Sequence, residues 1–247
     1  MSIYSEINNM NCNLTNKKLL ILFKIGRINN KIHEITELYC SKFNNNIDYY
    51  YLHCDESIYN EIEFHNNIIK FKFKDDNYES LLIKVIKAFN IFKDKSYTNI
   101  MVSNVSSFLN IPVLLNLIDK DTPCLSHQGY NYSFKNKIYN WPSGAGYILN
   151  IDTVRTLCDF FNKNNFIENN KLSKDFCDNY PTTDDIFFGY FLYLNNIKIT
   201  ELERCNVINN NININSSFKN YSHFRVKTGD YNTDFRYFSE LYKIIYS

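Results

Sequence analysis

Short apolar runs alternate with helical patterns along the first half of the chain. Continuous apolar or aromatic runs are typical of buried strands in a parallel sheet, and they occur at 17–23, 48–53 and 98–103. An alternating apolar and basic run at 68–73 predicts a further strand or a sheet edge. Amphipathic helical spacing, with Asp75-Asp76-Asn77 and Pro112 as start signals, occurs at 32–43, 78–93 and 112–118. This order predicts an α/β fold with a mostly parallel central sheet flanked by helices.

In such a sheet a ligand binds beyond the carboxyl ends of the strands. Those ends fall at 24–27, 54–56 and 103–106. The residues expected to meet a ligand there are Lys24, Gly26, Arg27, Asp55, Ser103, Asn104 and Ser106. The stretch 103–110 also fits a polar turn between a strand and a helix, and its residue types by themselves favour that simpler interpretation.

The second half of the chain has a less regular pattern. A strand is predicted at 147–149, and helices are predicted at 152–161, 186–194 and 235–246. No internal repeat and no linker is evident. We therefore predict a polar lead at 1–16 followed by one domain at 17–247, which divides into halves at 17–120 and 121–247.

Two carboxylates, Asp184 and Asp185, stand at the start of the helix predicted at 186–194. Acidic side chains at that place can cap the helix and complement its dipole. One of the two can instead serve as a general base, because sugar transfer with inversion needs a carboxylate that takes a proton from the acceptor hydroxyl. The doublet alone does not decide between these two roles.

The segment 141–147 contains the chain's single Trp and two of its six glycines. Two glycines around an alanine let the backbone bend sharply or pass close to a ligand. An aromatic face can stack on a sugar ring, although a single Trp more often belongs to a core. No third glycine follows, so a dinucleotide-binding loop is not predicted. The candidate ligand-binding residues of this segment are Trp141, Ser143, Gly144, Ala145 and Gly146.

Three basic residues alternate with apolar ones near the C-terminus. His223, Arg225 and Lys227 would share one face of a strand. Such a face can bind a diphosphate, with Arg as a planar fork and Lys as a point charge. A solvated strand face explains the pattern equally well.

Charge and cysteine content narrow the class of protein. The 27 Lys and Arg balance 26 Asp and Glu, which argues against nucleic acid as the main partner. The seven Cys include no C-x-x-C pair and no zinc-ligand spacing, and the N-terminus carries no leader pattern, so we expect reduced thiols and a cytoplasmic protein. No stretch approaches the roughly 18 apolar residues of a membrane span, so no transmembrane segment is expected.

The segments considered so far also form an ordered set. A helix at 79–92 is followed by S-N-x-S-S-F at 103–108, S-G-x-G-Y at 143–147, D-D-I-x-x-G at 184–189 and H-F-R-V-K-x-G-D at 223–230. This set resembles the fringe and β-1,3-galactosyltransferase-like enzymes. It resembles still more the uncharacterised glycosyltransferase-like proteins of giant viruses and bacteria. If the protein is viral, we expect it in the cytoplasm of the host. The resemblance covers roughly residues 17–245.

The resemblance implies a GT-A fold, a nucleotide-sugar donor that we expect to be UDP-linked, a glycan or protein acceptor, and inversion at the anomeric carbon. The donor would bind to 17–120, and 121–247 would supply the acceptor and catalytic side. Asp185 matches the catalytic aspartate of the family, with Asp184 in the place of a glutamate. The acceptor-side glycine segment matches Gly144, Ala145 and Gly146, and Lys84 matches a lysine in the helix before the family's D-x-D turn.

One departure from the family affects the metal. The metal-binding D-x-D falls on Asn104-Val105-Ser106, and neutral oxygen ligands are poor sole anchors for Mg²⁺ or Mn²⁺. The remaining candidate ligands are Asn104, Ser106 and His223, with Asp55 and Asp184 as further choices. We expect metal dependence to be reduced or absent, with a part of the cation's role taken by Lys24, Arg27, Lys84, Arg225 or Lys227. A non-catalytic nucleotide-sugar or glycan-binding protein is the alternative favoured by this departure, and a purely structural viral protein is a third.

Overall fold

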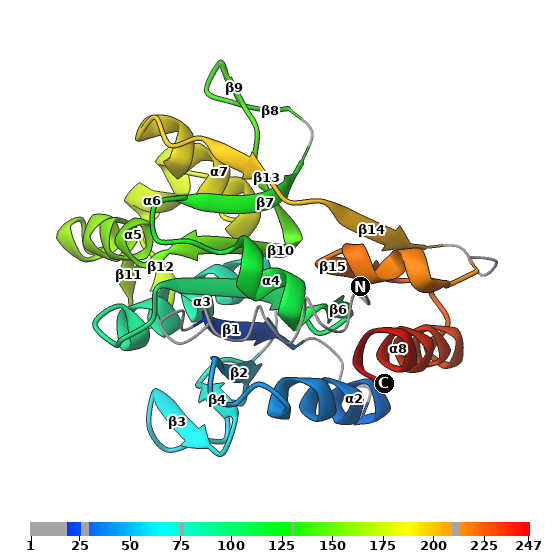
Figure 1. The fold of residues 1–247 in the computed structure, drawn as a ribbon. Helices are drawn as coiled ribbons and strands as arrows, with labels where there is room; N and C mark the ends of the chain where they lie inside the picture. The colour runs from blue at the N-terminus through cyan, green and yellow to red at the C-terminus, as the bar shows by residue number, and fades with distance from the viewer. Residues whose placement is uncertain (1–18, 26–29, 75–76, 130, 209–212) are drawn as a thin grey trace.

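The computed structural model describes residues 19–25, 30–74, 77–129, 131–208 and 213–247. The lead predicted at 1–16 and the predicted ligand-binding residues Gly26 and Arg27 lie outside the described residues. The described chain forms a large sheet with helices on both faces, and a smaller sheet lies to one side of it (Figure 1).

Eight strands form the central sheet, in the order β13-β7-β10-β5-β1-β2-β4-β3. Their bounds are β1 Leu19–Lys24, β2 Ile47–Cys54, β3 Ile62–His65, β4 Ile68–Phe71, β5 Asn99–Asn104, β7 Cys124–Gln128, β10 Pro142–Asn150 and β13 Ile199–Glu201. The four strands β5, β1, β2 and β4 are mutually parallel, as the sequence predicts. Within the described residues, β13 also pairs in parallel with β7, whereas β10 and β3 run antiparallel to their neighbours. The sheet is therefore mixed, with a parallel centre.

Strand β10 is the main difference from a parallel sheet. It contains the strand predicted at 147–149 but begins five residues earlier, at Pro142. A hairpin of β8 (Tyr132–Phe134) and β9 (Lys137–Tyr139) connects β7 to β10, with no crossover helix between them. A parallel return needs such a crossover, so β10 returns antiparallel to β7.

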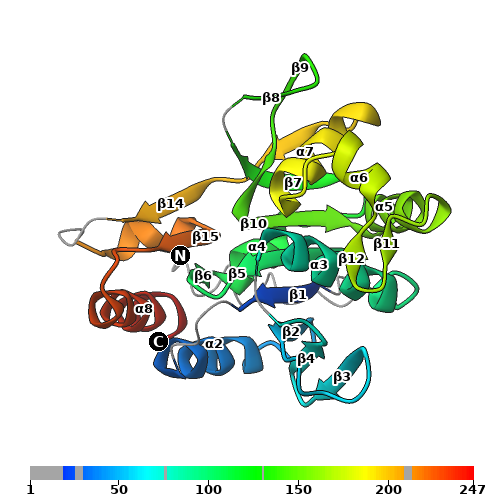
Figure 2. The same cartoon turned by 180° about the vertical axis from the view of Figure 1, so that it is seen from behind.

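The two faces of β1 separate the two halves of the core. Leu20 and Leu22 belong to the cluster packed under α3, α5 and α7, whereas Leu19, Ile21 and Phe23 belong to the cluster packed under α2, α4 and α8 (Figures 1 and 2). All five side chains are fully buried, and each such burial contributes roughly 1.5–3 kcal/mol. The helices span α2 Asn30–Ser41, α3 Tyr78–Phe92, α4 Ile111–Leu117, α5 Ile151–Lys163, α6 Lys174–Asn179, α7 Asp184–Leu194 and α8 Tyr231–Tyr246.

Local capping explains where two of these helices begin. Asn77 forms a capping box with Ser80 at the start of α3, as its position predicts. Helix α8 begins at Tyr231, four residues before the helix predicted at 235–246. The carboxylate of Asp230 accepts a hydrogen bond from the backbone N–H of Thr233, and this cap extends the helix toward its N-terminus.

The smaller sheet has the order β14-β15-β6, with β14 at Arg204–Val207, β15 at His223–Val226 and β6 at Ser107–Leu109. Strand β6 replaces part of the turn predicted after β5. It pairs antiparallel with β15, in a register that places Arg225 opposite Ser107. The short elements that remain are β11 Ile167–Glu168, β12 Lys171–Leu172 and the 3₁₀ turn η2 Ser216–Asn220.

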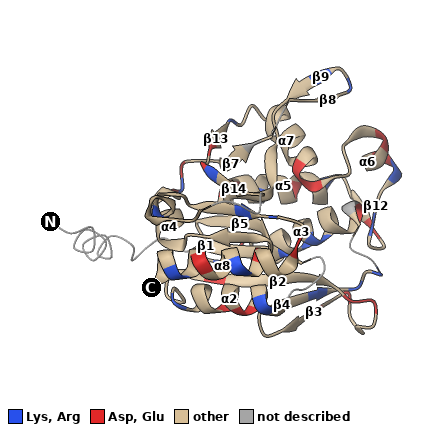
Figure 3. Ribbon diagram, turned by 90° about the vertical axis from the view of Figure 1, so that its right-hand side faces the viewer, with Lys and Arg blue, Asp and Glu red and all other residues tan. Residues whose placement is uncertain are grey.

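Charged residues are mixed over the helices. Basic and acidic positions are interspersed along α2 and α8 (Figure 3), in line with the balanced charge of the whole chain. Among the described residues, no helix is long and apolar enough to cross a bilayer.

Candidate active site

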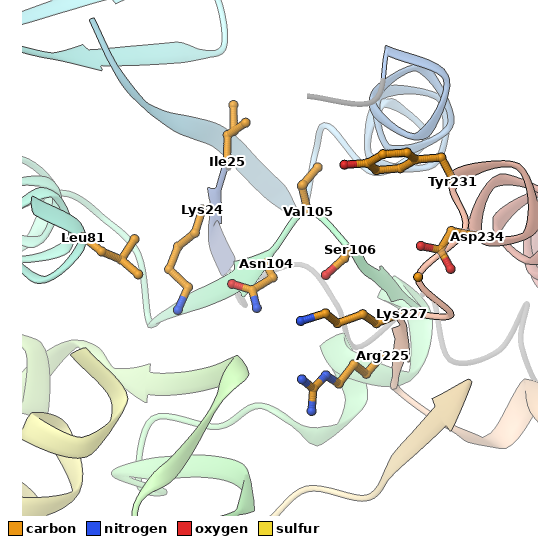
Figure 4. A pocket seen from close by; sticks show the side chains of 11 residues that line it. Lys24, Ile25, Leu81, Asn104, Val105, Ser106, Arg225, Lys227, Tyr231 and Asp234 are labelled. Carbon is orange, nitrogen blue, oxygen red and sulfur yellow. The ribbon is translucent and has the colours of Figure 1, made fainter. Parts of the chain in front are cut away.

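A pocket of about 560 Å³ opens at the carboxyl ends of β1 and β5 (Figure 4). This is the edge of a parallel sheet at which ligands are expected. Five of the predicted ligand-binding residues line it together: Lys24, Asn104, Ser106, Arg225 and Lys227. The rest of its lining comes from Ile25, Leu81, Val105, Gly229, Tyr231 and Asp234.

Backbone hydrogen bonds bring these distant segments to one place. The N–H of Val105 donates to the carbonyl of Lys24 at 3.2 Å, and the N–H of Val226 donates to the carbonyl of Ser106 at 3.0 Å. The ends of β1, β5 and β15 are thereby joined around the pocket. In Figure 4 the side chains of Lys24, Asn104, Lys227 and Arg225 point toward its centre.

Lys24 and Asp184 form a buried ion pair at the edge of the pocket. The Nζ of Lys24 lies 2.8 Å from Oδ2 of Asp184, and the two side chains are only 5% and 3% exposed. The Lys24 amine also lies 5.9 Å from the centre of the Tyr147 ring. Asp184 is therefore held by a cation inside the protein, which fixes the first turn of α7 against the end of β1.

Asp185, the next residue, has a different environment. It is half-buried and has no ion pair within the described residues. One carboxylate oxygen accepts a hydrogen bond from the N–H of Ile186 at 2.9 Å. Burial, and then the charge of Asp184, raise the pKa of the Asp185 carboxyl above its usual value, although Lys24 and the backbone hydrogen bonds oppose the shift. A carboxylate made more basic in this way is suited to accept a proton.

The glycine segment of β10 is shaped around the site. A Cβ at Gly144 would lie 2.5 Å from Oδ2 of Asp185, and a Cβ at Gly146 would lie 2.7 Å from the ring of His223. The Oγ of both Ser103 and Ser107 donates to the carbonyl of Ala145, which holds the irregular start of β10 against β5 and β6. A side chain at position 144 would therefore force the carboxylate of Asp185 to move.

Trp141 is packed into the protein on two sides. Its indole lies against the backbone of Gly129, its own backbone lies against Gly189, and the ring of Tyr132 meets it edge-on at 6.0 Å. These contacts account for a half-buried Trp at this place. A role for Trp141 in stacking on an acceptor stays a prediction.

Other predicted site residues lie outside the lining of the pocket. Ser103 is fully buried between strands, and Lys84 is fully buried with its amine 3.4 Å from the carbonyl of Leu52. Asp55 pairs with Lys70 at 2.9 Å and with Ser57, and these hydrogen bonds hold the pKa of the Asp55 carboxyl below its usual value. His223 and Ser143 lie behind the pocket, on the side of β14.

Three polar or charged side chains that approach the site were not predicted. Tyr231 and Asp234 line the pocket from the first turn of α8, and Asp234 accepts hydrogen bonds from the N–H and Oγ1 of Thr228. The D-Y-N-T-D run at 230–234 is typical of the start of a helix, and its residues do not by themselves indicate a binding site. Arg204 donates to the Oγ of Ser143, and it lies in an irregular stretch for which no strand was predicted.

The pocket is a poor fit for a divalent cation. Asn104 and Ser106 share it with Lys24, Arg225 and Lys227, and these cations oppose the binding of another. Within the described part of the chain, no group of three or more His, Cys, Asp or Glu side chains could hold a metal ion. Hard divalent cations prefer carboxylate oxygens, and the two predicted oxygen ligands that line this pocket are neutral. The carboxylate of Asp234 also lines the pocket, but one of its oxygens already accepts two hydrogen bonds from Thr228.

Comparison with known proteins gives distant likenesses only. No protein-family model and no curated protein matches the chain. A crystal structure of a glycosyltransferase involved in the glycosylation of the major capsid of PBCV-1 is 11% identical over 90% of this chain and 98% of that one, with a TM-score of 0.47. Crystal structures of Drosophila β1,4-galactosyltransferase 7, one of them a complex of a variant with manganese, UDP-Gal and xylobiose, are 12% identical over 75% of this chain and 64% of that one, with a TM-score of 0.40.

These neighbours belong to the class of enzyme expected from the sequence. Each is described as a glycosyltransferase or a galactosyltransferase. Identities of 11–12% and TM-scores of 0.40–0.47 do not establish the activity of this chain. The specific resemblance to fringe-like enzymes and to giant-virus proteins stays a prediction.

Proposed function

We propose that this protein is an inverting glycosyltransferase that moves a sugar from a nucleotide donor, expected to be UDP-linked, onto an acceptor hydroxyl. The observation that carries the proposal is Asp185, a carboxylate of raised pKa that packs on Gly144 beside the ion pair at the pocket. Asp185 does not itself line the pocket, whereas Lys24 of that ion pair, Arg225 and Lys227 do. Arg225 and Lys227 supply positive charge for a leaving diphosphate.

The proposed reaction is a single displacement. Asp185 takes the proton of the acceptor hydroxyl, and the hydroxyl oxygen forms a bond to the anomeric carbon while the bond from that carbon to the diphosphate breaks. The nucleoside diphosphate leaves with the electron pair, and the Asp185 carboxyl then releases its proton to solvent. Attack from the face opposite the leaving group inverts the anomeric centre.

The environments of the two carboxylates support this division of roles. Asp184 is held at 2.8 Å by Lys24, so its oxygen is occupied by a cation. Asp185 has one oxygen on the Ile186 N–H and the other against Gly144. In this proposal Asp184 is a positioning residue, and Asp185 is the base.

We further propose that the diphosphate is neutralised by side chains in place of a metal. Lys24, Arg225 and Lys227 line the pocket with Asn104 and Ser106, the two residues that the sequence resemblance matches to the metal-binding turn of fringe-like enzymes. Protein treated with EDTA is expected to keep its transfer rate within about twofold, because fixed cations can stabilise a leaving phosphate. Activity that is lost on chelation and restored only by Mn²⁺ would overturn this part of the proposal.

The main test is release of nucleoside diphosphate from a panel of UDP-, GDP- and dTDP-sugars. Asp185→Asn is expected to lower the rate by a factor on the order of 10²–10⁴, as loss of a general base does, and to leave donor affinity within about twofold. Asp152→Asn is the matched control, because Asp152 is exposed at the start of α5, at the opposite edge of the sheet. Full turnover by Asp185→Asn would remove Asp185 as the base.

A non-catalytic nucleotide-sugar-binding protein is the second candidate. The neutral pair Asn104 and Ser106 in the pocket favours it, because the fringe-like enzymes that the sequence resembles carry carboxylates at the matching positions. Saturable binding of a donor sugar, with no release of nucleoside diphosphate in the presence of any acceptor of the panel, would identify this function.

A further inference from the structure

Arg204 is a half-buried cation that forms no ion pair with the described residues, although the negative charge of Glu201 raises its pKa in part. Its Nη1 donates to the Oγ of Ser143, and its Nε is buried without a hydrogen-bond partner. Among the described residues, no carboxylate forms an ion pair with Arg204, Arg225 or Lys227. Burial, and then the charge of Arg225, lower the pKa of the Arg204 guanidinium to about 10. Keeping such a charge unpaired is unfavourable unless an anion arrives from outside.

His223 lies beside Arg204 and is also unsatisfied. The register of β14 and β15 pairs the two residues, and the imidazole is fully buried against Gly146. Neither ring nitrogen has a hydrogen-bond partner within the described residues. Burial, and then the charges of Arg204, His127 and Arg225, lower the pKa of His223 to about 3. The ring is therefore neutral, and it offers one N–H donor that nothing in the described chain accepts.

We propose that Arg204, His223 and Ser143 form a second anion-binding site, which receives a carboxylate or phosphate carried by the acceptor sugar. This inference rests on the proposed function, since it assigns the acceptor its chemical class. Arg204 is half-exposed, so an anion from solvent can reach the exposed part of its guanidinium, while the unpartnered Nε and the ring of His223 are buried beside it. Charge-assisted bonds of this kind are about twice as strong as neutral ones.

The position of the cluster separates it from the donor pocket. Arg225 and Lys227 line that pocket, whereas Arg204, His223 and Ser143 do not. The cluster contacts β10 at Ser143 and Gly146, and these residues flank Gly144, on which Asp185 packs. A sugar whose hydroxyl meets Asp185 can therefore place an anionic substituent on Arg204 while the diphosphate occupies Arg225 and Lys227.

The test measures binding of three matched monosaccharides to the whole protein by calorimetry, with and without saturating UDP. Glucuronate and glucose 6-phosphate are the anionic probes, and glucose is the neutral one. At least one anionic probe is expected to bind about tenfold more tightly than glucose, and Arg204→Gln is expected to remove this preference. The same variant should bind UDP within about twofold of the parent protein. Arg204→Lys should keep part of the preference for the anionic probe over glucose, and the matched control Arg155→Gln should keep all of it.

The outcomes separate this inference from the proposed function. Equal binding of the charged and neutral probes would overturn the anion site, even if UDP binds and transfer occurs. If Arg204→Gln lost affinity for UDP as well as for the anionic probe, Arg204 would belong to the donor pocket. That result would also overturn the anion site. Binding of an anionic probe that depends on Arg204, in a protein that does not bind UDP, would support the anion site and count against the donor function.

Discussion

Two groups of cations lie near the pocket, and they differ in whether the protein neutralises them. At the end of β1, Lys24 is paired with Asp184 at 2.8 Å, and both side chains are almost completely buried. On the smaller sheet, Arg204 and Arg225 have no carboxylate partner among the described residues, and neither does Lys227, which directly follows β15. The first group is internally complete, whereas the second group has excess positive charge.

This difference indicates that the two groups of cations have different roles. A buried ion pair holds two segments in a single geometry, because breaking it leaves an uncompensated charge inside the protein. Here the pair fixes the first turn of α7, and with it Asp185, against the end of β1. Cations that the fold leaves unpaired remain available to a ligand, which is why we assign them to anionic parts of the substrates.

Removal of the internal pair should have the largest effect. Lys24→Met leaves Asp184 buried without a partner and is expected to lower the free energy of unfolding by about 3–5 kcal/mol, as measured by urea denaturation. The double variant Lys24→Met/Asp184→Leu removes both charges and should recover most of that loss. If Lys24→Met were as stable as the parent protein, the contrast between the two groups would not hold.

The addition of a side chain at position 144 should have the second largest effect, and this effect should be on the rate of transfer. In Gly144→Ala the new Cβ would lie 2.5 Å from Oδ2 of Asp185, so the carboxylate has to move. A displacement of about 1 Å in a catalytic group can lower the rate about 100-fold, with donor affinity nearly unchanged. Steady-state kinetics of donor turnover check this, and a variant with an unchanged rate would show that the position of Asp185 does not limit the reaction.

An unpaired cation should behave in the opposite way to Lys24. Arg225→Gln is expected to leave the free energy of unfolding unchanged or slightly higher, because no ion pair is broken. It should weaken UDP binding about tenfold, the loss expected for a charge-assisted contact to phosphate. Calorimetry with UDP measures the affinity, and a marked loss of stability in this variant would place Arg225 with the structural pair.

Lowering the pH should have a smaller effect than these substitutions, and it should act differently through Asp185 and through His223. The raised pKa of Asp185 means that transfer should slow as the pH falls through that value, because the base becomes protonated. For stability, a carboxyl of raised pKa stabilises the fold at low pH and loses that contribution as the pH rises through its folded pKa. Asp185→Asn should therefore be at least as stable as the parent protein at neutral pH.

His223 acts on stability in the other direction. Its pKa falls from 6.5 when unfolded to about 3 in the fold, so its contribution is complete above the unfolded value and declines as the pH falls toward the folded one. Urea midpoints at about pH 7 and about pH 6 should show a modest loss of stability on acidification. That loss should be smaller in His223→Asn, and an identical loss in both proteins would assign the sensitivity to other groups.

Much of the first half of the molecule could be predicted from local pattern. The run that forms β1 is apolar throughout because both of its faces are covered by helices, and Asn77 marks the start of α3 through a bond made within four residues. The sheet edge where Lys24, Asn104 and Ser106 meet follows from the rule for parallel strands. The apolar run and the helix cap depend on neighbours along the chain, whereas the sheet edge follows from the fold class, because Lys24 and Asn104 end adjacent parallel strands.

The second half could be predicted less well because its features depend on pairing between distant residues. Strand β10 is antiparallel because a hairpin precedes it. Arg204 is significant only because β14 lies beside β15 and places it next to His223. An isolated basic residue in an irregular stretch carries no sign of such a neighbour.

The sequence by itself determined the parallel centre of the sheet, a helix over 186–194 preceded by two carboxylates, and the residue types offered to a ligand, since each is encoded in periodicity, capping or composition. Only the tertiary structure decided which of two adjacent carboxylates is neutralised and which is held against Gly144. It also decided which cations remain without a partner. The physical reason is that burial and charge pairing act across residues 160 positions apart, as between Lys24 and Asp184, and the pattern along the chain does not record that distance.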